Sequence, residues 1–160
     1  NLIHEKGLEP EIIAGTSTAG IPPAAWLAEL LNLPMVYVRS EKKDHGKGKQ
    51  VEGLLPKRVK VLLIEDLIST GKSSLGAIRA IQAAGGKVDT CLAILNYQLK
   101  EAKNAYQKMR IDLFTLTNLE AVILMAQKLG LINDKEKKLV EDWNNDPRNW
   151  GNRIGQTVEY

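Results

Sequence analysis

Short apolar runs alternate along most of this chain with segments whose apolar residues recur at helical spacing. This alternation is typical of an α/β fold, in which helices cover a parallel sheet. The strands are expected at residues 11–15, 35–39, 59–65, 88–95 and 111–116, and the helices at 21–32, 73–84, 99–109, 119–129 and 135–143. We therefore expect a mostly parallel central sheet flanked by helices.

The two ends of the chain predict less regular structure. Residues 1–7 are typical of the end of a helix, and we expect further residues upstream of them. The segment from Asn144, with its scattered Asn and Gly, predicts a poorly ordered tail. We expect one domain over residues 1–146 and a C-terminal tail over 147–160, since a chain of 160 residues fits a single domain.

Individual side chains add three expectations. The helix at 119–129 is expected to be capped by Thr117 or Asn118, and the helix at 135–143 follows Asn133. Trp26 and Trp143 occupy apolar positions of predicted helices, where packing in the core is a better interpretation than stacking on a base.

Charge and cysteine content exclude several classes of protein. The net charge is only +3, and no basic run is interleaved with aromatics, so nucleic-acid binding is not expected. No stretch approaches the roughly 20 apolar residues that span a bilayer. The single Cys91 cannot form an intrachain disulfide, which favours a reducing compartment. We therefore expect a cytoplasmic protein without a membrane partner.

The strongest local signal is the predicted strand that ends in Glu65 and Asp66 and opens onto the turn Ser69–Ser73. Open α/β sheets bind ligands at this end of a strand, where the two carboxylates can accept hydrogen bonds from sugar hydroxyls. Backbone N–H groups of a turn at a helix N-terminus suit a phosphate, and Gly71 allows a close approach. A P-loop is disfavoured because Leu67 stands where its first Gly is needed. Plain capping of a strand and a helix is the alternative.

The turn that contains Thr18, Ala19 and Gly20 repeats this logic after the first strand, with Pro22 near the start of the next helix. Taken alone it is a weak signal, since many turns between strands and helices are rich in Gly and Ser. Two oxyanion-binding turns on neighbouring strands fit a substrate with phosphate groups at both ends.

A long polar segment over residues 40–57 interrupts the alternation, and loops of this length are usually functional or disordered. From Arg39 to Lys49 it carries five cationic side chains against two acids, together with His45. A charge run is usually a solvated surface. With Gly46 and Gly48, however, the segment can form a cationic lid over an anionic transition state.

These motifs resemble those of the type I phosphoribosyltransferases over about residues 11–146. The long loop further resembles that of the orotate phosphoribosyltransferases, whose pattern Arg-Lys-x-x-Lys-x-His-Gly is matched by Arg39, Lys43, His45 and Gly46. Ser40 and Ala19 depart from the pattern, since some members carry Lys there, and we interpret both as subgroup variation. The resemblance does not reach the family's N-terminal segment, which helps to cover the orotate base, and we expect that segment to be missing from this sequence.

The resemblance implies a type I phosphoribosyltransferase fold with a mobile catalytic loop. It implies transfer of ribose 5-phosphate from phosphoribosyl pyrophosphate to orotate, which yields orotidine 5-phosphate and pyrophosphate in pyrimidine biosynthesis. It further implies Mg²⁺ as a cofactor without a protein ligand, and a homodimer with shared active sites. Catalytic roles fall to Lys43, His45 and Asp66. Substrate contacts are expected at Thr18, Ala19, Gly20, Arg39, Glu65, Asp66, Leu67, Ile68, Ser69, Thr70, Gly71, Lys72 and Ser73.

Two alternatives remain open at this point. A purine phosphoribosyltransferase shares the motif around Glu65 and Asp66, although the Lys-x-His-Gly loop argues against it. A regulator that senses phosphoribosyl pyrophosphate without turnover would bind the same ligand, but it would normally carry a DNA-binding domain, which this sequence does not show.

Overall fold

The computed structural model describes residues 2–40 and 49–153. The chain forms two compact units, residues 1–116 and 117–160, and the boundary falls within the single domain expected over residues 1–146. Each unit is described by itself below. In the described residues, no helix has the length and apolar character needed to cross a membrane.

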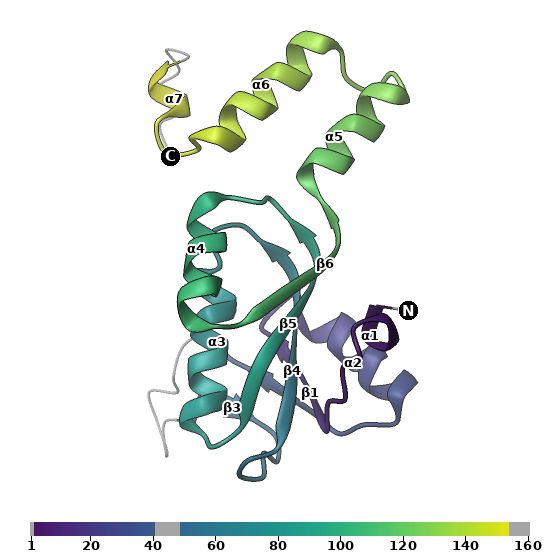
Figure 1. Ribbon diagram of the computed structural model, residues 1–160, viewed down its shortest axis with the longest axis vertical. Coiled ribbons are helices and arrows are strands. Elements are labelled where there is room, and N and C mark those ends of the chain that lie inside the picture. The colour runs from purple at the N-terminus through teal and green to yellow at the C-terminus, as the bar shows by residue number, and fades with distance from the viewer. Residues whose placement is uncertain (1, 41–48, 154–160) are drawn as a thin grey trace. The chain divides into compact units, whose positions relative to one another are not determined.

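The first unit is built on a six-stranded sheet with the order β3-β2-β1-β4-β5-β6 (Figure 1). Strand β1 is parallel to β2 and β4, β4 is parallel to β5, and β2 and β3 are antiparallel. The strands are β1 (Ile12–Thr16), β2 (Met35–Val38), β3 (Val51–Glu52), β4 (Lys60–Ile68), β5 (Lys87–Asn96) and β6 (Asp112–Asn118). The expected mostly parallel sheet is therefore confirmed.

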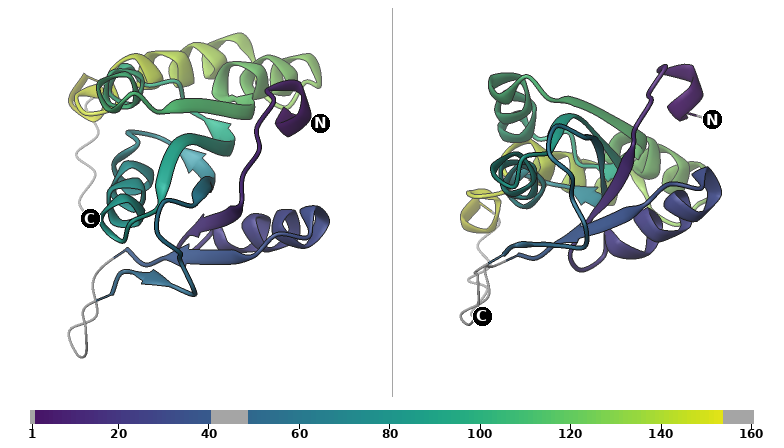
Figure 2. Two further views of the ribbon diagram at one scale, coloured as in Figure 1. Left: turned by 60° about the horizontal axis from the view of Figure 1, so that its bottom comes forward. Right: turned by 90° about the horizontal axis from the view of Figure 1, so that it is seen from below.

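Helices cover both faces of this sheet (Figure 2). They are α1 (Leu2–Glu5), α2 (Ile21–Leu31), α3 (Lys72–Ala83) and α4 (Lys100–Met109). Side chains that alternate along each strand feed two cores: Ile13 and Leu62 pack with α1 and α2, whereas Ile12 and Leu63 pack with α3 and α4. Strand β1 is buried along its whole length, as expected for a strand covered on both faces.

Three sequence expectations differ from this unit. Strand β4 continues past Glu65 to Ile68, because the apolar pair Leu67–Ile68 prolongs its pairing with β5. Strand β3 was not predicted, since its two residues carry no periodic signal. The prediction that Trp26 packs in the core is wrong, because the side chain is 74% exposed. Helix α2 buries Ala24 and Ala28, and a residue two positions after Ala24 lies on the opposite side of the helix.

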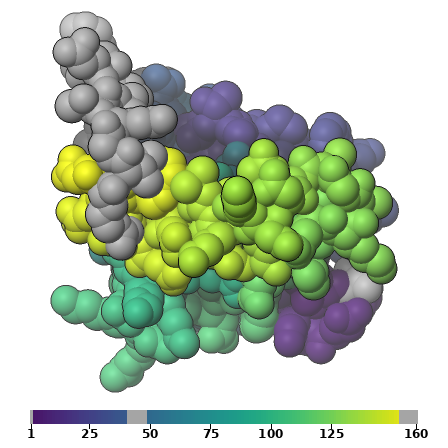
Figure 3. Space-filling view, turned by 90° about the horizontal axis from the view of Figure 1, so that it is seen from above, coloured from purple at the N-terminus to yellow at the C-terminus, as the bar shows by residue number. Residues whose placement is uncertain are grey.

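The second unit contains α5 (Leu119–Lys128), α6 (Asp134–Asn145) and α7 (Trp150–Arg153), and Figure 3 shows the surface of these helices in green to yellow. Asn118, rather than Thr117, caps α5, since its side chain accepts a 2.9 Å hydrogen bond from the Ala121 N–H. Asn133 and Glu136 form a capping box at the start of α6. Helix α6 contacts α5 and buries no side chain completely.

The poorly ordered tail expected from Asn144 is wrong for part of its length. Helix α6 extends to Asn145, and residues 150–153 form α7. The Asn149 side-chain amide donates to both carboxylate oxygens of Asp146, at 3.1 and 3.2 Å, which stabilises the turn between the two helices. Residues 154–160 lie outside the described part.

Candidate functional site

A pocket of about 560 Å³ lies at the carboxyl ends of the parallel strands in the first unit. Three predicted motifs meet at this edge, because β1, β2 and β4 are neighbours that run in the same direction. The pocket is lined by Thr16, Arg39, Ser40, Gln50, Glu65, Leu67, Ser69, Thr70, Gly71, Lys72, Ser73, Ser74, Gly76, Ala77 and Arg79. The order of the strands thus brings together segments that are far apart in the sequence.

The turn Ser69–Ser73 connects β4 to α3 and forms one wall of the pocket. Gly71 is the N-cap of α3 with φ 77°, a left-handed conformation that favours glycine. A Cβ atom at this position would lie 3.0 Å from the Tyr106 ring, closer than ordinary van der Waals contact, so the ring would have to move to admit a side chain. The N-cap Gly71 has no side chain to cap α3, and only a long 3.4 Å hydrogen bond from the Lys72 N–H to Thr70 Oγ1 is seen at the first turn in the described residues, so N–H groups there can bind an anion.

The acid pair lies on β4, separated from this turn only by Leu67 and Ile68. Glu65 is buried, with 5% of its surface exposed, and its Oε1 accepts a 3.3 Å hydrogen bond from the Asp66 N–H. Burial, with the neighbouring Asp66 carboxyl as a second cause, raises the pKa of Glu65 to about 8. A mostly protonated carboxyl at neutral pH can both donate a hydrogen bond to a sugar hydroxyl and accept one from it.

Thr16 faces this carboxyl from the end of β1. Its hydroxyl opposes the rise of the Glu65 pKa only weakly, as the last and smallest of the causes. Thr16 Oγ1 is buried and has no hydrogen-bond partner of good geometry in the described residues. Since buried polar groups are normally paired, the Thr16 hydroxyl and the Glu65 carboxyl together fit a polar ligand at the base of the pocket.

The turn after β1 lies against β4. Ser17 Oγ donates to the Val38 carbonyl at 2.8 Å, and the Gly20 N–H donates to the Thr16 carbonyl at 3.0 Å. The Ser17–Thr18 peptide bond is cis. A Cβ atom on Gly20 would lie 2.8 Å from the Ile64 carbonyl oxygen, so only glycine fits. Thr18 and Ala19 are exposed.

The cationic segment enters and leaves the sheet beside the pocket. The Arg39 N–H donates to the Gln50 carbonyl, and the Gln50 side-chain amide donates to the Arg39 carbonyl, both at 2.9 Å. The Arg39 guanidinium lies 3.6 Å from the Glu52 carboxylate. Lys43 and His45 fall outside the described residues. The segment that carries them is therefore anchored at both ends on the rim of the pocket.

Most of the predicted contact residues line this pocket: Arg39, Glu65, Leu67, Ser69, Thr70, Gly71, Lys72 and Ser73. Asp66, Thr18, Ala19 and Gly20 lie at the same edge of the sheet but are not part of its lining. Ile68 is 1% exposed and its carbonyl accepts from the Tyr97 N–H, so its side chain faces the core rather than a ligand.

Sequence reasoning missed Thr16, Gln50, Ser74 and Arg79. One signal pointed to Arg79, because Lys72, Gly76 and Arg79 follow the i, i+4, i+7 spacing of one helix face. The other three depend on tertiary packing. Together with Arg39 and Lys72, Arg79 gives the rim three cationic side chains, which suits a ligand with several negative charges.

The fit of a metal ion depends on the acids present. In the described residues there is no group of three or more His, Cys, Asp or Glu side chains that could hold one. Glu65 and Asp66 alone do not form a protein site, so an ion in this pocket would take most of its ligands from a bound substrate. Mg²⁺ fits this role, since it commonly binds substrate phosphates with few protein ligands.

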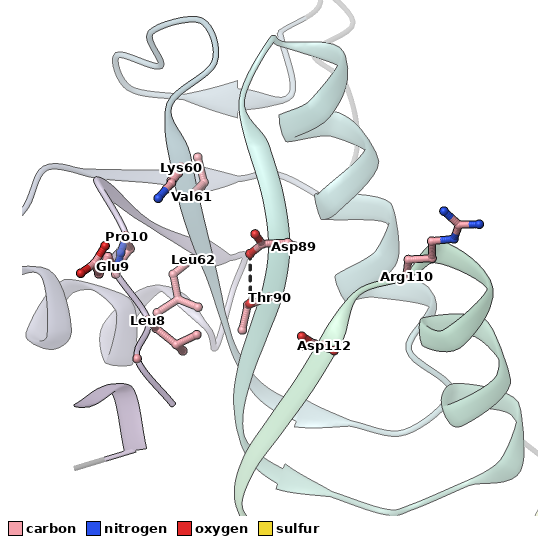
Figure 4. Close-up of a pocket in the computed structure, with 11 residues that line it drawn as sticks. Leu8, Glu9, Pro10, Lys60, Val61, Leu62, Asp89, Thr90, Arg110 and Asp112 are labelled. Carbon is pink, nitrogen blue, oxygen red and sulfur yellow. Dashed lines mark hydrogen bonds between the residues drawn. The ribbon is translucent and has the colours of Figure 1, made fainter. Parts of the chain in front are cut away.

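A second pocket, of about 320 Å³, lies at the amino-terminal ends of strands in the same sheet (Figure 4). Lys60, Asp89 and Asp112 contribute to it from the starts of β4, β5 and β6. Thr90 donates to the Asp89 carboxylate at 3.0 Å. This pocket has no turn at the start of a long helix and is separate from the candidate site.

Comparison with known proteins gives consistent matches. A family model for the phosphoribosyl transferase domain matches residues 1–122. The orotate phosphoribosyltransferase of Lactiplantibacillus plantarum is 48% identical over 141 residues, which cover 88% of this chain and 66% of that protein. The orotate phosphoribosyltransferase of Fusobacterium nucleatum is 48% identical over 144 residues, which cover 90% of this chain and 68% of that protein.

The solved structures include the orotate phosphoribosyltransferase from Aeropyrum pernix, which matches with a TM-score of 0.67 and 32% identity. The match covers 78% of this chain and 68% of that chain. The chain thus spans about two thirds of the length of these relatives.

Proposed function

The chain belongs to the phosphoribosyltransferase family, and within it to the orotate phosphoribosyltransferases, and from this premise we propose that it transfers ribose 5-phosphate from phosphoribosyl pyrophosphate to N1 of orotate. The products are orotidine 5-phosphate and pyrophosphate, in the cytoplasmic synthesis of pyrimidine nucleotides. The observation that carries the proposal is the adjacency of Glu65 and the turn Ser69–Ser73 in one pocket, because it pairs a sugar-binding acid with a phosphate-binding turn.

The turn Ser69–Ser73 holds the 5-phosphate. N–H groups at the start of α3 point toward the anion, and the hydroxyls of Ser69, Thr70 and Ser73 add donors. Glu65 and Asp66 bind the ribose hydroxyls at the end of β4. These contacts fix the sugar relative to the sheet, so that its anomeric carbon is positioned for attack by the base.

Departure of pyrophosphate is the step that needs charge stabilisation, because negative charge grows on the leaving group as the sugar becomes cationic. Lys43 and His45 donate to the pyrophosphate from the segment anchored at Arg39 and Gln50. One well-placed donor of this kind contributes about 3 kcal/mol to lowering a barrier. The turn Thr18–Gly20 binds the pyrophosphate from the neighbouring strand. Mg²⁺ bound with the substrate beside Glu65 and Asp66 would supply further neutralisation of charge on the leaving group.

The proposal includes a homodimer in which the cationic segment of one subunit completes the site of its partner. Helix α2 supports an interface, since Trp26 and Leu30 are 74% and 77% exposed and lie four residues apart on one side of the helix. Large apolar side chains grouped in this way are typical of a surface that a partner covers.

The test is orotate consumption, followed by absorbance, with phosphoribosyl pyrophosphate and Mg²⁺. We expect turnover with orotate and none with adenine or guanine. Turnover with a purine but not with orotate would show that the acceptor is a purine and contradict the proposal. Binding of phosphoribosyl pyrophosphate without turnover of any base would identify a sensor and contradict the proposed reaction.

A further inference from the structure

Tyr106 is a buried residue of α4 that contacts the phosphate-binding turn from a distant part of the sequence. It is 3% exposed, and its ring occupies the space where a Cβ of Gly71 would lie. Its hydroxyl donates a 2.7 Å hydrogen bond to Ser74 Oγ, and the Ser74 hydroxyl donates in turn to the Gly71 carbonyl at 3.2 Å. Two consecutive hydrogen bonds therefore connect α4 to the turn.

The second bond of this relay bears on the direction of a phosphate-binding group. The Gly71 carbonyl also accepts from the Leu75 N–H at 3.0 Å, so two donors hold it toward the body of α3. In a trans peptide the carbonyl and the next N–H point in opposite directions. Holding the Gly71 carbonyl inward therefore turns the Lys72 N–H outward, where it makes a long 3.4 Å hydrogen bond to Thr70 Oγ1 and can exchange that bond for a shorter one to an anion.

We propose that Tyr106 is a positioning residue for the phosphate turn: through Ser74, its hydroxyl fixes the Gly71–Lys72 peptide in the orientation that binds the 5-phosphate of phosphoribosyl pyrophosphate. Tyr106 itself touches no substrate. The inference rests on the proposed function only for the identity of the ligand, since the geometry requires no more than a phosphate monoester at the turn.

The hydroxyl of Tyr106 is the group that orients the Gly71–Lys72 peptide, whereas its ring packs against Gly71. A Phe at this position would fill the same space against Gly71 but would leave Ser74 Oγ without its donor. The Cys91 thiol lies 3.5 Å from the Tyr106 oxygen on the other side, a longer contact that does not reach the turn. Burial raises the pKa of the Tyr106 hydroxyl, so it remains a donor over the whole working range of pH.

The experiment compares Tyr106→Phe, Ser74→Ala and the double variant with the unmodified protein. It measures KM for phosphoribosyl pyrophosphate, KM for orotate, kcat, and the dissociation constant of ribose 5-phosphate by calorimetry. We expect each single change to raise KM for phosphoribosyl pyrophosphate and the ribose 5-phosphate constant about fivefold, the loss typical of one neutral hydrogen bond. KM for orotate should stay constant and kcat should change less. The double variant should be no worse than either single one, because both break the same relay.

Cys91→Ala is the matched control, because it removes the other neighbour of the same buried hydroxyl without touching the turn. It should lower the melting temperature and leave ribose 5-phosphate binding unchanged. The proposal is overturned if Tyr106→Phe leaves that binding unchanged, if Cys91→Ala weakens it equally, or if the effects of the two single changes add.

The ribose 5-phosphate titration separates this inference from the proposed reaction. If the unmodified protein binds ribose 5-phosphate but does not consume orotate, the reaction is wrong while the effect of Tyr106→Phe on binding still decides the role of Tyr106. If it does not bind ribose 5-phosphate at all, the inference is overturned as well.

Discussion

Glu65 carries a buried carboxyl whose charged form is unfavourable in the folded protein. Its pKa is raised from 4.5 to about 8, first by burial and then by Asp66. Between these two values the folded state retains a proton that the unfolded state has lost. Stability is therefore expected to fall as the pH rises from about 4.5 to about 8, and the lost stability does not return above that range.

The variant Glu65→Gln tests this expectation, because it removes the ionisation and keeps the shape. Its melting temperature should exceed that of the unmodified protein at pH 8 and approach it at pH 5. On the order of 1–3 kcal/mol of unfolding free energy separates the two proteins at pH 8. Glu29→Gln, at an exposed position of α2, should show no such difference. An equal gain at both pH values would rule out the ionisation as the cause.

Gly71 and Gly76 make a matched pair on α3. Gly71 has φ 77° and a Cβ there would lie 3.0 Å from the Tyr106 ring, whereas a Cβ on Gly76 would meet nothing within 4 Å. Gly71→Ala should lower the unfolding free energy by about 1–3 kcal/mol and weaken ribose 5-phosphate binding. Gly76→Ala should raise it by about 0.5–1 kcal/mol, because Ala is the better helix former. Urea unfolding measures the free energy of both variants. If Gly71→Ala stabilised the protein, a side chain at position 71 would not be strained.

Single residues also mark the limit of sequence reasoning. A short local pattern singles out Glu65, Gly71 and Ser73, and the structure places all three in the lining of one pocket. No such pattern singles out Tyr106 and Thr16, since their contacts join strands and helices that are distant in the sequence. Trp26 was placed in the core because its hydrophobicity suggested burial, but the buried stripe of α2 is formed by the smaller Ala24 and Ala28.

At the level of elements, the expected strands and helices of the sheet are present within a few residues of their predicted ends. The errors have local causes. Strand β3 has only two residues and lies in a polar segment, and β4 continues to Ile68 although the acid Glu65 predicts its end. Helices α6 and α7 extend into a region whose polar composition predicted a tail. Hydrogen bonding around Asn133 and Asp146, rather than burial, accounts for this difference.

Asn133 is expected to be important for the stability of α6. Its side chain accepts from the N–H groups of Lys135 and Glu136, at 2.9 and 3.0 Å, while Glu136 accepts from the Asn133 N–H. Asn133→Ala should cost about 1 kcal/mol and Asn133→Asp almost nothing, since Asp is an equally good cap. Hydrogen exchange of amides in α6 measures the change. If the α6 amides exchange as slowly in Asn133→Ala as in the unmodified protein, the cap is dispensable.

At the scale of the whole molecule, the proposed homodimer predicts complementation between defective subunits. One subunit carries Lys43→Ala and the other carries Glu65→Ala with Asp66→Ala. If the cationic segment acts in the partner's site, each heterodimer contains one site with both sets of groups intact. Mixing should therefore restore turnover in proportion to the amount of heterodimer.

Two mixtures serve as controls for this experiment. Each variant alone should remain inactive, and a mixture of two differently tagged Lys43→Ala preparations should gain nothing. Heterodimers confirmed by tag pull-down that show no turnover would contradict shared active sites. The same mixing of Glu65→Ala and Asp66→Ala subunits should also fail, because both changes lie in the same half of the site.

The pairing of β2 with β3 has a consequence for how this protein can change over evolution. Arg39 and Gln50 are joined by two hydrogen bonds where the chain leaves and re-enters the sheet. The segment between them therefore begins and ends at nearly the same place. Substitutions, insertions or deletions in that interval need not alter the register of any strand. Natural variation can therefore change this segment while the strands and turns that line the pocket are inherited unchanged.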